Sequence, residues 1–144
     1  MAPTHGGAES PDLTWQGAER ITVYCRTDSP ELEQRDLCRR VEALAAEQSP
    51  LPVRALAPGD PDLLAPRSVA LLADFASQDG AAGPLLIFTL RLYRHGGEPV
   101  LFGSRPRAAP LTADGASGAL DRELRAALSE ILPRRGPTRP AGRP

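Results

Sequence analysis

Apolar and polar positions repeat with a period of two in several segments of this chain, and this pattern predicts strands. β-branched and aromatic residues fill positions 21–24 and Cys25 follows them. The period of two places Ile21, Val23 and Cys25 on one face of an expected first strand. The clearest alternation covers residues 85–94. We expect that segment to form the principal strand of the protein.

Two other segments repeat their apolar residues every three to four positions, which predicts amphipathic helices. The first helix is expected to begin at Ser29 as N-cap, with Pro30 in its first turn, and to end near Gln48. The second is expected to begin at Ser117 and to stop before Pro133. Their apolar stripes are Leu37, Val41, Leu44 and Ala45 in the first, and Leu120, Leu124, Ala127, Leu128 and Ile131 in the second.

Turn residues divide the chain between these two helices. Residues 51–66 are interrupted by proline, so we expect at most a short edge strand at 53–56, followed by a loop. Residues 68–77 fit a strand, with a short helix as the alternative. Glycine-containing turns separate 68–77, 85–94 and 100–107, and this spacing predicts an antiparallel meander.

The element order β-α-(β)-β-β-β-α predicts an α+β fold. We expect a two-layer sandwich in which both helices cover one face of a mainly antiparallel sheet of about four or five strands. Residues 1–17 are predicted to form a flexible leader, 18–133 a single domain, and 134–144 a disordered tail rich in Arg, Pro and Gly. In outline, this order resembles the small βα modules that accompany bacterial envelope assemblies and transport systems.

Composition narrows the range of partners. The net charge of −1 and pI near 6.1 argue against nucleic acid as a partner. All 17 basic residues are Arg, which fits the coding bias of a GC-rich bacterial genome. The chain contains no apolar run long enough to span a membrane and no recognisable signal peptide. If the protein is exported, we expect its signal peptide to have preceded Met1.

Cys25 and Cys38, the only two cysteines, point to a compartment. The expected strand carries the chain about 13 Å away from Cys25, and the expected helix brings it back about the same distance to Cys38. We therefore predict a disulfide and an exported protein of the periplasm or envelope, with two buried thiols in a cytoplasmic protein as the alternative. Redox and metal chemistry are disfavoured, because Cys38 lies deep in its helix and His5 and His95 fall in the leader and in a turn.

The sequence predicts no catalytic residue, cofactor or metal site. Asp74 lies in an apolar strand, where we expect it to point to solvent from the sheet. The alternative is a small enzyme whose site is built around Asp74, Tyr93 and Arg91.

The second face of the expected sheet is more apolar than a solvated face should be. We predict that it is an interaction surface for a protein partner or a second copy in a homodimer, which makes the chain a non-enzymatic binding or accessory module. The alternatives are a face covered by a loop, by the leader with Trp15 or by one of the helices, and a cytoplasmic adaptor that uses the Arg-rich tail. The predicted surface consists of Leu72, Leu85, Ile87, Arg91, Tyr93, Leu101 and Arg105.

Overall fold

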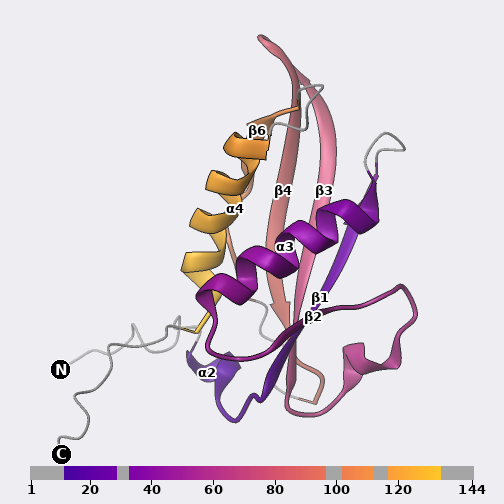
Figure 1. Ribbon diagram of the computed structural model, residues 1–144, viewed down its shortest axis with the longest axis vertical. Coiled ribbons are helices and arrows are strands. Elements are labelled where there is room, and N and C mark those ends of the chain that lie inside the picture. Colours follow the sequence, from indigo (N-terminus) through magenta and orange to yellow (C-terminus); the bar gives the residue numbers. More distant parts are fainter. Residues whose placement is uncertain (1–11, 29–32, 97–101, 112–116, 134–144) are drawn as a thin grey trace, which may run out of the picture.

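The structure, a computed structural model, describes residues 12–28, 33–96, 102–111 and 117–133 (Figure 1). The elements follow one another as α2 (Asp12–Trp15), β1 (Arg20–Thr27), α3 (Gln34–Gln48), β2 (Val53–Ala55), the 3₁₀ turn η1 (Pro61–Leu64), β3 (Ser68–Gly80), β4 (Gly83–Tyr93), β5 (Phe102–Gly103), β6 (Arg107–Pro110) and α4 (Ser117–Ile131).

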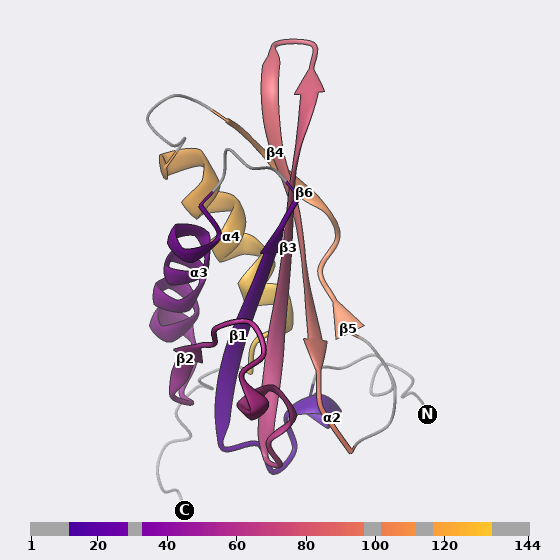
Figure 2. The ribbon, with the colours of Figure 1, turned by 90° about the vertical axis from the view of Figure 1, so that its right-hand side faces the viewer.

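The strands form one mixed sheet in the order β2-β1-β3-β4-β5, and β6 pairs with β4 on the same side as β5. Strand β1 runs parallel to both β2 and β3, because α3 returns the chain across the sheet between β1 and β2. From β3 onward the pairing is antiparallel. Helices α3 and α4 cover one face of the sheet, as Figure 2 shows. The predicted two-layer α+β fold is confirmed.

The core lies between this face and the two helices. The apolar residues that alternate along the strands pack there against the apolar stripes of the helices, as the sequence pattern predicted. Phe75 and Phe88 pack with ring centroids 5.7 Å apart, and Val41 and Leu124 are fully buried. The strand residues of this core include Ile21, Val23, Cys25, Val69, Leu71, Ala73, Leu86, Leu90 and Leu92.

Two boundaries differ from the expectations. The predicted cap at Ser29 and Pro30 lies outside the described residues, and α3 begins at Gln34. The expectation of one strand over 100–107 is wrong, because the structure has two short strands, β5 and β6. The backbone N–H of Ser104 donates to Leu90 O (2.8 Å) while the Ser104 hydroxyl accepts from Leu90 N (3.3 Å), so a side chain interrupts the ladder. Pro106, which has no N–H, follows in this interruption.

The other segments agree with the sequence pattern. Strand β2 occupies Val53–Ala55, and β3 is a strand over its whole length rather than a helix. Within the described residues, no helix is long and apolar enough to cross a membrane.

The last residues of the expected leader pack against the domain. Trp15 of α2 is 7 % exposed, and its indole N–H donates to the carbonyl of Ile131 at the end of α4 (2.8 Å). The Arg94 guanidinium donates to Thr14 O (2.9 Å) on the same short helix. The remainder of the expected leader and the expected tail lie outside the described residues.

Candidate functional site

Cys25 of β1 and Cys38 of α3 are joined by a disulfide, with their Cα atoms 5.5 Å apart. Both residues are buried in the core between the sheet and α3. Nearby, the Gln34 side-chain amide donates to Cys25 O (2.6 Å) and strengthens the same junction. The pair therefore ties the first strand to the first long helix, and neither sulfur is available as a nucleophile.

The opposite face of the sheet, called here the helix-free face, carries the alternate residues of β1, β3 and β4. The strand registers arrange these residues in rows across the sheet. The rows are Thr22–Ala70–Tyr93, Tyr24–Leu72–Arg91, Arg26–Asp74–Thr89, Ala76–Ile87 and Gln78–Leu85.

A charged triad crosses the middle of this face. Asp74 Oδ1 accepts a hydrogen bond from Arg26 Nε (2.7 Å), and Asp74 Oδ2 accepts one from Arg91 Nη2 (3.0 Å). The hydrogen bond to Asp74, with the charge of its carboxylate, raises the pKa of Arg26 above its usual value. The triad carries one net positive charge, and both oxygens of Asp74 are engaged.

Apolar and aromatic residues surround the triad. Leu72, Ile87, Leu85 and Tyr93 are all half-buried on the helix-free face. At the end of the face near Thr22 and Ala70, both of these residues are buried, and η1 packs against β1 and β3 there (Figure 2). A loop thus covers Thr22 and Ala70 at one end of the face and leaves Tyr93 and the rows from Tyr24 to Gln78 as the candidate surface.

The sequence-predicted surface is brought together in large part. Leu72, Leu85, Ile87, Arg91 and Tyr93 share the helix-free face, and Arg105 is exposed in the segment between β5 and β6. Leu101 lies outside the described residues.

The alternative enzyme site is not assembled in the same way. Tyr93 pairs with Ala70, which lies about 13 Å along β3 from Asp74 at the usual strand rise. The Tyr93 hydroxyl instead lies 3.3 Å from His95 Nδ1. Asp74 keeps 28 % of its side chain exposed, and both of its carboxylate oxygens accept hydrogen bonds from arginines in this structure.

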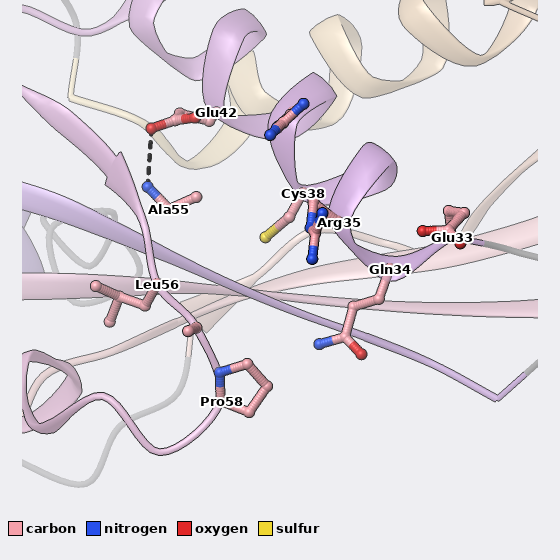
Figure 3. Close-up of a pocket in the computed structure, with 10 residues that line it drawn as sticks. Glu33, Gln34, Arg35, Cys38, Glu42, Ala55, Leu56 and Pro58 are labelled. Atoms are coloured by element: carbon pink, nitrogen blue, oxygen red, sulfur yellow. Dashed lines mark hydrogen bonds between the residues drawn. The ribbon is translucent and has the colours of Figure 1, made fainter.

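Sequence reasoning missed a second feature, a groove of about 570 Å³ between the first half of α3 and the segment after β2 (Figure 3). In Figure 3, Arg35 and Gln34 extend from α3 toward the side that carries Leu56 and Pro58. Glu42 and Ala55 also line the groove, and Glu42 Oε2 accepts the backbone N–H of Ala55 (2.9 Å). Helical spacing could have predicted the position of Glu42 from the sequence. Glu42 lies one turn after Cys38 and therefore faces the same strands.

The groove offers charges of both signs, from Glu33, Arg35, Arg39 and Glu42. No group of three His, Cys, Asp or Glu side chains that could hold a metal ion occurs within the residues that the structure describes. The groove therefore presents a polar wall without a metal-binding cluster in the described chain.

The fold places the chain among two-layer α+β proteins with a mixed sheet and both long helices on one side. Among solved structures it is similar to PelC from Paraburkholderia phytofirmans, which forms a dodecamer. The PelC dodecamer matches with a TM-score of 0.52 and 14 % identity over 82 % of this chain and 90 % of the PelC chain. A leucine-to-methionine variant of that dodecamer matches with a TM-score of 0.51 and 15 % identity, over 81 % of this chain and 91 % of the PelC chain. At these identities the likeness shows a shared fold. No family model and no curated protein matches the sequence.

Proposed function

We propose that this chain is an exported, non-enzymatic module that assembles with further copies of itself through the helix-free face. The observation that carries the proposal is this face, with its apolar rows and central arginines, in a chain that shares its fold with the dodecameric PelC. Fold alone does not fix function, so the main support for self-assembly is the chemistry of the face.

The composition of the face is that of a protein contact surface. Leucine and isoleucine side chains supply apolar area, while Tyr24, Tyr93, Arg26 and Arg91 supply aromatic and guanidinium groups. Tyrosine and arginine are the residue types that most often anchor protein interfaces. The apolar residues are half-buried, so burial by a second copy removes a modest area of each from water, and the gain is spread over several rows.

The proposed location rests on the disulfide. Disulfides persist in oxidising compartments and are rare in the cytoplasm. The Cys25–Cys38 bridge therefore supports an exported protein, in the periplasm or another part of the envelope.

The proposed interface can be tested by placing a charge at its centre. Leu72→Glu replaces an apolar contact in the row of Tyr24 and Arg91 with a carboxylate. Burial against another copy would remove this carboxylate and the neighbouring Arg91 from water, which costs free energy even for paired charges. Ala46→Glu is the matched control, because it adds the same charge at an exposed position of α3, on the other side of the molecule. The proposal expects the wild-type protein and Ala46→Glu to form oligomers in light scattering at micromolar concentration, and Leu72→Glu to be monomeric.

Circular dichroism and denaturation of the monomeric fraction separate loss of assembly from loss of folding. A wild-type protein that is strictly monomeric would contradict the proposal. Equal oligomerisation of the two glutamate variants would contradict the choice of this face.

A further inference from the structure

The edges of a sheet present backbone groups to which another strand can bind, and proteins usually block them. In this protein the outer edge of β2 is blocked by Glu42, whose carboxylate accepts the Ala55 N–H. The outer edge of β4 is covered by the short strands β5 and β6. The backbone N–H of Leu111 extends this cover by donating to Pro84 O (2.9 Å).

One further edge, the outer side of β3 beyond β1, has no such cover from the part of the chain that the structure describes. The pairing of β1 with β3 ends at Thr27 opposite Phe75, and the last hydrogen bond runs from Asp28 N to Phe75 O (3.2 Å). The β3–β4 hairpin continues to Gly80 opposite Gly83 and extends past both helices, as Figures 1 and 2 show. Within the described residues, nothing pairs with the outer edge of residues 76–80.

Alternation along β3 identifies the free backbone groups. Because the carbonyl of Phe75 points toward β1, the N–H and C=O groups of Ser77 and Asp79 point the same way, away from β4. Pro84, opposite Asp79 on β4, fits this assignment, since a proline belongs where no N–H is needed within the pair. Both Ser77 and Asp79 are exposed.

We propose that this edge binds the same edge of a second copy, with the two β3 strands antiparallel and Gln78 opposite Gln78 of the second copy. The inference rests on the proposed self-assembly and adds a second contact to it. In this register Ser77 of each copy lies opposite Asp79 of the other, so a hydroxyl meets a carboxylate. A register centred on Asp79 would place two carboxylates opposite each other, which is unfavourable.

The two-fold arrangement also has a consequence for the helix-free face. Residues opposite each other in an antiparallel pair point to the same side of the sheet. The helix-free faces of both copies therefore lie on the same side and form one continuous surface. A strand pair this short buries far less surface area than a stable interface does. We therefore expect it to add to the contact through the helix-free face rather than to replace that contact.

Cysteine cross-linking tests this register directly. Gln78→Cys places a thiol on the two-fold axis, at a pair whose Cα atoms would be about 4.5 Å apart, within the range of a disulfide. Ala46→Cys, exposed on α3, is the control for random collision. Under mild oxidation we expect Gln78→Cys to form covalent dimers at roughly ten times the rate of the control or more, with mass spectrometry showing a link between the two introduced cysteines.

A second substitution makes the test specific for the opposing residues. Ser77→Asp in the Gln78→Cys background places aspartate opposite Asp79 and is expected to slow cross-linking, while Ser77→Lys is expected to speed it. Equal rates of covalent dimer formation for Gln78→Cys and Ala46→Cys would overturn the inference. It would also be overturned if Gln78→Cys stayed monomeric because the edge binds only a different protein. If Leu72→Glu disrupts assembly while Gln78→Cys does not cross-link, the edge inference fails and the proposed function stands.

Discussion

At the scale of single residues, Cys25 and Cys38 illustrate how a local spacing acquires a structural role. The two residues are 13 positions apart, and the strand and helix between them bring the sulfurs together. A bridge at this separation limits the unfolded chain more than the folded one, because the folded geometry is already set by β1 and α3.

Replacing both cysteines by alanine is expected to lower the free energy of unfolding by about 3 kcal/mol through the lost chain constraint. Denaturant titration measures the change, and the wild-type protein treated with a reductant is the control that should lose a similar amount. A thiol count on the unfolded, non-reduced wild-type protein should find none. Two reactive thiols there would contradict both the bridge and the exported location.

At the scale of elements, the short helix α2 is held by contacts to distant parts of the chain. Trp15 is buried against the core and bonds to the last turn of α4, while Arg94 at the end of β4 binds the carbonyl of Thr14. These contacts join the N-terminal segment to both layers of the sandwich. We infer that α2 belongs to the folded unit even though its sequence lacks helical periodicity.

Two substitutions at Trp15 separate packing from hydrogen bonding. Trp15→Phe keeps an aromatic ring but leaves Ile131 O without its donor, which is expected to cost about 1–2 kcal/mol of unfolding free energy. Trp15→Ala also creates a cavity and is expected to cost about 3–5 kcal/mol. Chemical denaturation followed by circular dichroism measures both. Similar, small losses for the two variants would show that Trp15 contributes little to the core.

At the scale of the whole molecule, ion pairs connect the helices and the sheet. Arg40 of α3 binds Asp121 of α4 (2.8 Å), and Arg107 of β6 binds both Glu123 (2.9 Å) and Glu130 (2.7 Å) of α4. The hydrogen bonds that Arg107 donates to Glu130 and Glu123 raise the pKa of Arg107 above its usual value. These groups are partly exposed, so we expect them to fix the relative position of the layers more than to add stability.

Deletion of the Arg-rich tail tests whether assembly depends on this tail or on the two proposed contacts. Deleting residues 134–144 leaves the helix-free face and the β3 edge intact, so we expect the oligomeric state in light scattering to be unchanged. The full-length chain at the same concentration and ionic strength is the control. Loss of assembly on deletion would instead favour the alternative in which the tail makes the contact.

Much of the fold could be predicted because it depends on local periodicity. The alternation over Ile21, Val23 and Cys25 and the stripe at Val41 and Leu44 specify which side of each element is apolar, whatever its neighbours are. The prediction of a single strand at 100–107 was wrong because the structure there does not depend on local periodicity. Its interruption depends on how Ser104 meets Leu90, a contact between segments that no local pattern describes.

The candidate site shows the same division. Sequence patterning alone determined that the second sheet face is apolar, that Asp74 lies on it, and that Cys25 and Cys38 can meet, because these follow from residue spacing within one or two elements. Tertiary structure alone decided that Asp74 is held by Arg26 and Arg91, that Glu42 blocks the β2 edge, and that residues 76–80 of β3 extend beyond β1. Each of these depends on strand order and register, which are set by pairing between segments far apart in the chain.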